Sequence, residues 1–117
     1  MLAQEGVDVN TQDYNGRTPL HAAARFRNVE LLNLLLAQKA IDVNLQDNER
    51  CTPLHVAVTY SAFECVESLL TVSNINVNIK DKWKSTPLTC AGRLKPPYKY
   101  KISKLLIKHG GKPGRKC

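Results

Sequence analysis

Residues 18–21 read Thr-Pro-Leu-His, residues 52–55 read Thr-Pro-Leu-His again, and residues 86–89 read Thr-Pro-Leu-Thr. Both intervals are 34 residues. A second landmark, Asp-Val-Asn or Asn-Val-Asn, keeps the same interval at residues 8–10, 42–44 and 76–78. Two landmarks with one shared period indicate an internal repeat, and periods of about 20 to 50 residues are typical of solenoids and other repeat arrays.

Each unit contains the signals for two short helices. Thr18 is a good N-cap, and Pro19 suits the first helical position, where its missing N–H costs nothing. The first helix is expected to end near residues 26–28, and a second, leucine-rich helix is expected over residues 29–37. An isolated helix pair cannot bury that many leucines, so the units must stack on one another.

These residues resemble ankyrin repeats, whose pattern runs D-x-x-G-x-T-P-L-H-x-A-A, followed by a leucine-rich helix and G-A-D-V-N. Asp13, Gly16 and residues 18–21 of the first unit match closely, and the resemblance covers essentially the whole chain. The resemblance implies an all-α solenoid of helix-turn-helix units joined by short β-hairpin-like loops.

The period divides the chain into one domain of stacked units. Residues 1–112 are expected to form this domain, and residues 113–117 a basic tail. Its parts are a partial repeat (1–10), repeat 1 (11–44), repeat 2 (45–78) and a divergent C-terminal repeat (79–112). Leu2 matches Leu36, so the chain begins inside a second helix. We expect a piece of a longer array; alternatively, a partner or a short helix covers the open end at Leu20 and Leu31.

The third unit is three residues longer than the first between its Thr and its paired leucines. The extra length falls in residues 95–100, where two prolines predict an extended loop before a helix over about residues 101–109. Gly110 is expected to cap that helix, and the polar Ser103 replaces an apolar residue of the earlier units. A polar face is typical of a terminal capping repeat.

Two turn positions lack the glycine that the pattern calls for. Gly16 becomes Arg50 and Lys84 in the later units, and the glycine after the first helix is replaced in all three, by Arg27, Ser61 and Lys95. If these residues keep a positive φ, each costs about 1 kcal/mol, which predicts a marginally stable array.

The composition fits a folded globular domain. The chain has 117 residues, 43% of them apolar and 23% charged, and neither a membrane-spanning stretch nor a signal peptide is expected. Its four cysteines have no metal or redox spacing, so reduced thiols and a cytoplasmic or nuclear location are expected. Residues 1–79 hold five basic and nine acidic residues, a net charge of −4, whereas residues 80–117 hold twelve and one, a net charge of +11.

No residue set indicates catalysis, a metal site or a cofactor. His21 and His55 recur at the period, and the resemblance implies that they hold the turns by hydrogen bonds. Asp13, Asp47 and Asp81 recur likewise and are expected to order the hairpin loops. Cys65 is expected in the core, whereas Cys51 and Cys117 are expected to be the accessible thiols, so we predict that the chain is not an enzyme.

The resemblance implies a protein-binding surface on the hairpin tips and the exposed side of the first helices. Trp83, Phe26 and Tyr60 are the expected anchors, because aromatic residues and Arg are enriched at binding hot spots. The alternative is that these aromatics pack on the loops. The full predicted set is Tyr14, Asn15, Arg17, Arg25, Phe26, Asn48, Glu49, Cys51, Thr59, Tyr60, Lys82, Trp83, Ser85, Arg93 and Leu94.

The third unit also carries a lysine-rich set interleaved with tyrosines. The predicted basic patch comprises Lys80, Lys84, Lys95, Lys99, Lys101, Lys104 and Lys108. Such a patch would steer an acidic protein partner to the groove. Three alternatives stay open: nucleic-acid or other polyanion binding, a merely solvated face, and a purely structural segment of a larger ankyrin scaffold.

Overall fold

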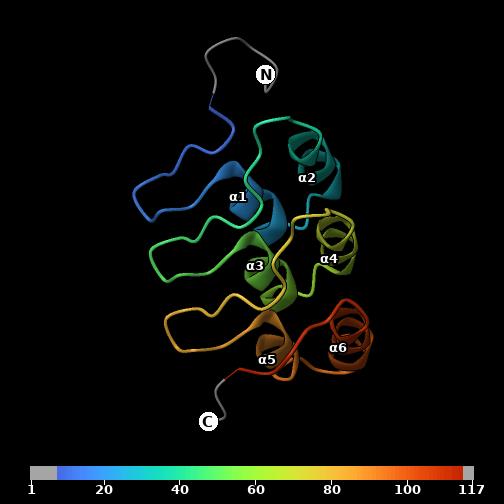
Figure 1. Ribbon diagram of the computed structural model, residues 1–117. Helices are drawn as coiled ribbons and strands as arrows, with labels where there is room; N and C mark the ends of the chain where they lie inside the picture. Colours follow the sequence, from blue (N-terminus) through green and yellow to red (C-terminus); the bar gives the residue numbers. More distant parts are fainter. Residues whose placement is uncertain (1–7, 115–117) are drawn as a thin grey trace.

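The computed structural model describes residues 8–114, which form three pairs of helices. The pairs are α1 (Pro19–Arg25) with α2 (Val29–Leu36), α3 (Pro53–Thr59) with α4 (Phe63–Leu70), and α5 (Pro87–Ala91) with α6 (Tyr98–Lys108). Helices α1, α3 and α5 stack in an inner layer, and α2, α4 and α6 stack beside them in an outer layer (Figure 1). The result is an elongated stack of 43 × 25 × 23 Å, and the expected all-α solenoid is confirmed.

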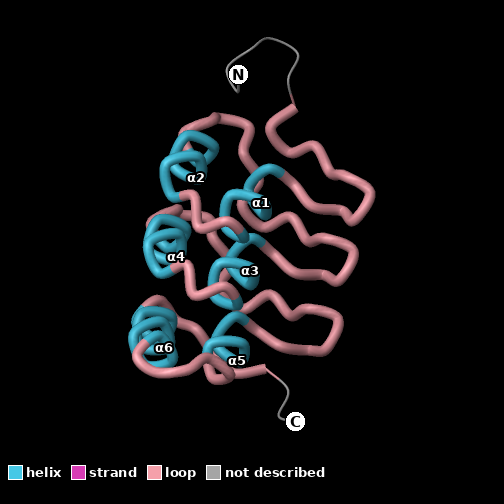
Figure 2. Tube along the Cα trace, turned by 180° about the vertical axis from the view of Figure 1, so that it is seen from behind, coloured by secondary structure: helices cyan, strands magenta, loops and turns pink. Residues whose placement is uncertain are grey.

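Long loops connect each outer helix to the next inner helix and project from the inner layer, away from the outer helices (Figure 2). The loops contain no strand within the described range, but their tips are joined by backbone hydrogen bonds. The Asn48 N–H donates to the Asn15 carbonyl at 2.9 Å, and the Lys82 N–H donates to the Glu49 carbonyl at 3.0 Å. Each hairpin loop is therefore anchored to the next.

The Thr-Pro-Leu-His sequence starts the inner helices as expected. The Thr18 hydroxyl accepts from the His21 N–H, and the His21 ring accepts from the Thr18 N–H, which makes a reciprocal capping box. Thr52 and His55 repeat this arrangement. Thr86 caps α5 through the Thr89 N–H alone, because Thr89 has no ring to return the bond.

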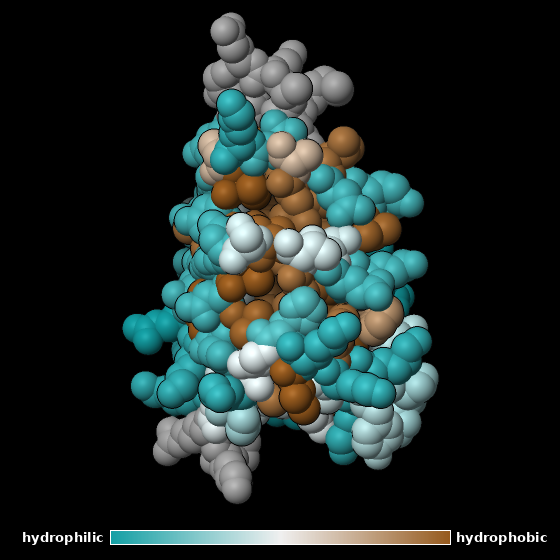
Figure 3. All heavy atoms as spheres, turned by 45° about the vertical axis from the view of Figure 1, so that its right-hand side comes forward, coloured by the Kyte–Doolittle hydropathy of each residue, from teal (hydrophilic) through white to brown (hydrophobic). Residues whose placement is uncertain are grey.

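The core runs through all three units. Its largest fully buried side chains include Leu20, Leu32, Leu35, Leu54, Leu69, Ile102 and Leu106. Figure 3 shows apolar residues in a broken band along the long axis of one face, framed by polar ones. Cys65 is buried in this core, as expected, and Ser103 is half-buried at the end of the stack.

The prediction for residues 95–100 was wrong. Helix α6 begins at Tyr98 with Pro97 as its N-cap, so these residues do not form an extended loop up to residue 101. A proline is tolerated at a helix start because the first N–H groups have no partner in the helix. The three extra residues lengthen the helix: α6 has 11 residues, whereas α2 and α4 have eight each. Gly110, at φ +88°, follows the last turn and confirms the expected cap.

Four of the five glycine replacements adopt a left-handed backbone. Arg27 and Ser61 have φ of 55°, Arg50 has 63° and Lys84 has 67°. Lys95 is not among the positive-φ residues, because the longer third unit changes the path of the chain at this point. The expected left-handed backbone is therefore confirmed at four positions and wrong at the fifth.

The ends of the described chain are tied to the stack by asparagines of the Asp-Val-Asn landmark. Asn10 donates to the Ala40 carbonyl and accepts from the Asp42 N–H, and Asn78 bonds Gly110 and Lys112 in the same way. Residues 1–7 of the partial repeat and 115–117 of the tail, including Cys117, lie outside the described residues. At the N-terminal edge Leu34 is exposed and Leu31 half-buried, whereas Leu20, expected to be uncovered, is fully buried.

Candidate functional site

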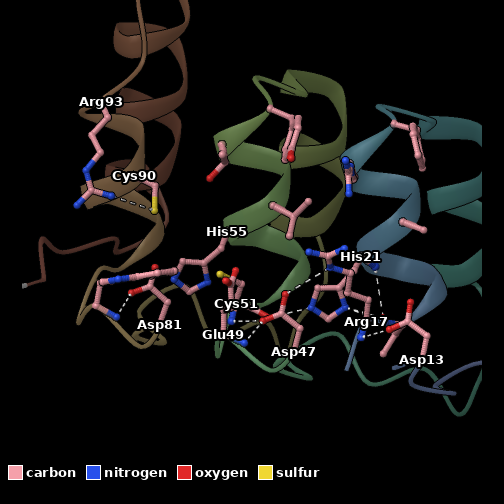
Figure 4. Close-up of a pocket in the computed structure, with 18 residues that line it drawn as sticks. Asp13, Arg17, His21, Asp47, Glu49, Cys51, His55, Asp81, Cys90 and Arg93 are labelled. Atoms are coloured by element: carbon pink, nitrogen blue, oxygen red, sulfur yellow. Dashed lines mark hydrogen bonds and ion pairs between the residues drawn. The ribbon is translucent and has the colours of Figure 1, made fainter. Parts of the chain in front are cut away.

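A groove of about 410 Å³ lies between the three hairpin loops and the inner helices. Side chains from all three units face it (Figure 4). Its lining comprises Asp13, Arg17, Thr18, His21, Ala22, Arg25, Phe26, Asp47, Glu49, Cys51, His55, Val56, Thr59, Tyr60, Asp81, Trp83, Cys90 and Arg93.

The recurring aspartates hold the hairpin loops at the base of this groove. Asp47 Oδ1 accepts from the Glu49 N–H at 2.8 Å and the Cys51 N–H at 2.9 Å. Asp13 and Asp81 accept from the corresponding amides of their own loops. Two backbone N–H donors lower the pKa of Asp13 below its ordinary value. The prediction that these residues order the loops is confirmed.

The two histidines link neighbouring units. Because each Nδ1 accepts from a threonine N–H, the proton lies on Nε2, which donates to a carbonyl of the next unit. His21 donates to the Cys51 carbonyl at 2.8 Å, and His55 donates to the Ser85 carbonyl at 2.9 Å. Both side chains are 1% exposed, and burial lowers the pKa of both. These rings hold the turns, as the sequence predicted.

Three aromatic side chains line the groove and are open to solvent. Phe26 is 74% exposed, Trp83 56% and Tyr60 44%, which rules out the alternative that these rings are packed under the loops. The Arg25 guanidinium carbon lies 5.7 Å from the ring centroids of both Phe26 and Tyr60. Lys82 Nζ lies 4.7 Å from the centroid of Trp83. Each exposed ring is thus paired with a cation.

The structure places nine of the fifteen predicted binding residues in the groove lining: Arg17, Arg25, Phe26, Glu49, Cys51, Thr59, Tyr60, Trp83 and Arg93. Tyr14, Asn15, Asn48 and Lys82 belong to the hairpin tips outside this lining. Ser85 and Leu94 correct the prediction. Ser85 is 1% exposed and accepts from Arg93, and Leu94 packs on the core.

Several lining residues were not predicted as groove residues from the sequence. Ala22, Val56 and Cys90 occupy one repeat position on successive inner helices and form the groove floor. These three residues are spaced 34 positions apart, so identifying one of them as a groove residue would have identified the other two from the sequence.

Cys51 is half-buried, which corrects the expectation of an accessible thiol. Burial raises the pKa of Cys51 to about 12, with Asp47 and Asp81 adding to the shift, and burial also raises the pKa of Cys90. Both thiols stay protonated at neutral pH and are poor nucleophiles. Within residues 8–114 no three His, Cys, Asp or Glu side chains are grouped to hold a metal ion. Over the same range, no helix is long and apolar enough to cross a membrane.

The predicted basic patch is split between two parts of the third unit. Lys80 and Lys84 lie on its hairpin loop, whereas Lys99, Lys101, Lys104 and Lys108 lie on α6 in the outer layer, beyond the inner helices (Figures 1 and 2). Lys95 precedes α6. The prediction of one continuous lysine-rich surface was therefore wrong, since the inner layer separates the hairpin from the outer helix.

Lys101 of α6 lies beside rings of two different helices. Its Nζ lies 4.8 Å from the Phe63 ring centroid on α4 and 5.9 Å from that of Tyr98, so it joins the second unit to the third. We expect Lys101→Ala to lower the free energy of unfolding by about 0.5–1 kcal/mol. Lys104→Ala is the matched control and should change it by less than about 0.3 kcal/mol, as measured by urea unfolding. Equal effects would show that the cation–ring contact adds no stability.

Comparison with known proteins agrees with this architecture. A family model described as ankyrin repeats (3 copies) matches residues 1–81 and 40–117. A fowlpox virus (strain NVSL) protein described as an ankyrin repeat protein is 50% identical over 36 residues, 31% of this chain. An L-asparaginase of Dirofilaria immitis is 55% identical over 31 residues, 26% of this chain.

Both matched segments are about one repeat long and cover 5% of the relative's own length. They therefore report likeness between single repeats and carry no activity over to this chain. The matches of the family model, by contrast, extend from the first residue to the last. The chain belongs to the ankyrin-repeat family.

Proposed function

We propose that this chain is a recognition module that binds a partner protein through its groove, as an adaptor, inhibitor or targeting subunit. Ankyrin repeats are generally protein–protein interaction modules and typically not enzymes. The observation that carries the proposal is that Phe26, Tyr60 and Trp83, one from each unit, all line one groove and are exposed. Exposed aromatic side chains beside cations are the usual composition of binding hot spots.

The groove supports binding better than catalysis. His21 and His55 are buried and engaged in linking the units, and the Cys51 and Cys90 thiols are protonated. The hairpin loops use the aspartate carboxylates as acceptors. The groove side chains that are exposed and not engaged in these structural roles are therefore the ones that a partner can contact. Cys51, Cys65 and Cys90 are free thiols, which suit a reducing compartment, so the proposal includes a cytoplasmic or nuclear location.

Trp83→Ala is expected to weaken partner binding about tenfold or more and to leave the urea midpoint nearly unchanged. Trp83 is more than half exposed, so little core packing is lost, whereas a central aromatic contributes strongly to an interface. The measurement is a pull-down from lysate with mass spectrometry, with and without nuclease, followed by titration of the recovered protein.

Tyr100→Ala removes an equally exposed ring from α6, far from the groove lining, and is the matched control. If both variants bind alike, the groove is not the interface. If the captured material disappears with nuclease, binding of nucleic acid replaces the proposal. A large loss of stability in Trp83→Ala would show that the ring is a structural element.

A further inference from the structure

Arg25 lies with its side chain between two aromatic rings in the groove. It is the last residue of α1, and the two rings beside it come from neighbouring units, Phe26 from the first and Tyr60 from the second. Among the described residues its side chain makes no hydrogen bond, and the two ion pairs of this part of the chain involve other cations. Ring faces position a guanidinium but accept no N–H in its plane, so residues 8–114 leave the hydrogen-bond donors of Arg25 unused.

The other charges around the groove are arranged differently. Arg17 lies 4.0 Å from Asp47, and Lys82 lies 3.9 Å from Glu49. Asp13, Asp47 and Asp81 accept the amides of their loops. Arg25 is thus the arginine of the groove that faces solvent between two rings with no carboxylate within 4 Å in residues 8–114.

We infer that Arg25 is a carboxylate receptor, which binds one Asp or Glu side chain from an extended segment of the partner; this inference rests on the proposed function. The planar guanidinium matches a carboxylate through two parallel N–H···O bonds. Phe26 and Tyr60 restrict its motion and shield the pair from water. A doubly charged phosphate fits less well, because four carboxylates line the same groove and repel a larger negative charge.

The stack also sets a minimum length for that segment. Packed helices lie about 8–10 Å apart, so contact with Arg25 in the first unit and Trp83 in the third spans at least about 16–20 Å along the stack. An extended chain advances about 3.3 Å per residue. The acidic residue and the residue that meets Trp83 are therefore at least about five positions apart in the segment.

The test is a selection of random 12-residue peptides displayed on phage against the chain itself, followed by titration of synthetic peptides. The selected peptides should share an Asp or Glu at one position. Replacing that residue by Asn or Gln should weaken binding about tenfold or more. In Arg25→Ala the acidic peptide and its amide should bind equally, within about twofold. In Arg25→Lys the preference for the acidic peptide over its amide should fall to a few-fold, because an ammonium cannot form the two parallel hydrogen bonds.

Lys39→Ala removes an exposed cation outside the groove lining and should keep the full preference. The ¹⁵N spectrum of the Arg25 Nε–H should shift with the acidic peptide and not with its amide. Recovery of no peptide, of peptides without a shared acidic position, or of a preference that survives Arg25→Ala would each overturn the inference. If a Trp83-dependent protein is still captured from lysate, the groove proposal stands and the receptor role of Arg25 alone fails.

Discussion

Replacing Arg27, Arg50, Ser61 and Lys84 together by glycine should raise the free energy of unfolding by about 2–4 kcal/mol. Each residue has a φ between 55° and 67°, where a Cβ approaches the carbonyl oxygen at a cost of about 1–2 kcal/mol. Glycine removes that strain but adds about 0.5–1 kcal/mol of unfolded-state entropy, so the net gain is about 0.5–1 kcal/mol at each site. None of the four side chains makes a hydrogen bond or ion pair within the described part of the chain, so no contact of that kind is lost.

The chain offers its own control for this prediction. Lys95 stands at the same repeat position as Arg27 and Ser61 but is not left-handed, so Lys95→Gly should lower stability by about 0.5–1 kcal/mol. The two variants should therefore move the urea midpoint in opposite directions in far-UV circular dichroism. A gain in both would point to the loss of positive charge instead, and a loss in both would mean that the left-handed backbone is not strained.

Much of the fold follows from one period. The Thr-Pro-Leu-His landmark starts the inner helices through local hydrogen bonds, so it could be assigned before any tertiary contact was known. The prediction at α6 is wrong because two consecutive prolines, Pro96 and Pro97, also favour an extended loop. A proline also fits the first turn of a helix, and only packing against α4 and α5 decides between the two.

The groove was predicted less completely, for a related reason. Some side chains of a hairpin loop face the groove and others are covered by the neighbouring unit. The sequence does not show which of them are covered. Ser85 shares the repeat position of Arg17 and Cys51, and its carbonyl accepts from His55 as the Cys51 carbonyl accepts from His21. In the third unit, however, Arg93 also donates to the Ser85 hydroxyl, and Ser85 is buried. Cys90 was missed because it looks like an ordinary core cysteine until Arg93 and the loops enclose a groove beside it.

Acidification from pH 6.5 to pH 5.5 should remove up to about 2 kcal/mol of stability through His21 and His55. Burial lowers the pKa of both in the folded chain from the ordinary 6.5. Below pH 6.5 the unfolded chain therefore binds protons that the folded chain does not, and stability falls with pH by up to about 1.4 kcal/mol per pH unit for each ring. The loss continues until pH reaches the folded-state pKa. Asp13, whose pKa is lowered from 3.8, adds its own loss only at more acidic pH, outside this window.

This loss of stability should come from the two histidine rings that link the units. Protonation at Nδ1 removes the acceptor of the Thr18 or Thr52 N–H, and Nε2 already donates to a carbonyl of the next unit. His55→Gln should lower stability at every pH but about halve the slope between pH 6.5 and 5.5, measured as urea midpoints across that range. His109→Gln changes an exposed histidine outside these links and should keep the full slope. A slope unchanged in His55→Gln, or a flat profile in the parent chain, would show that the units are not joined through neutral histidine.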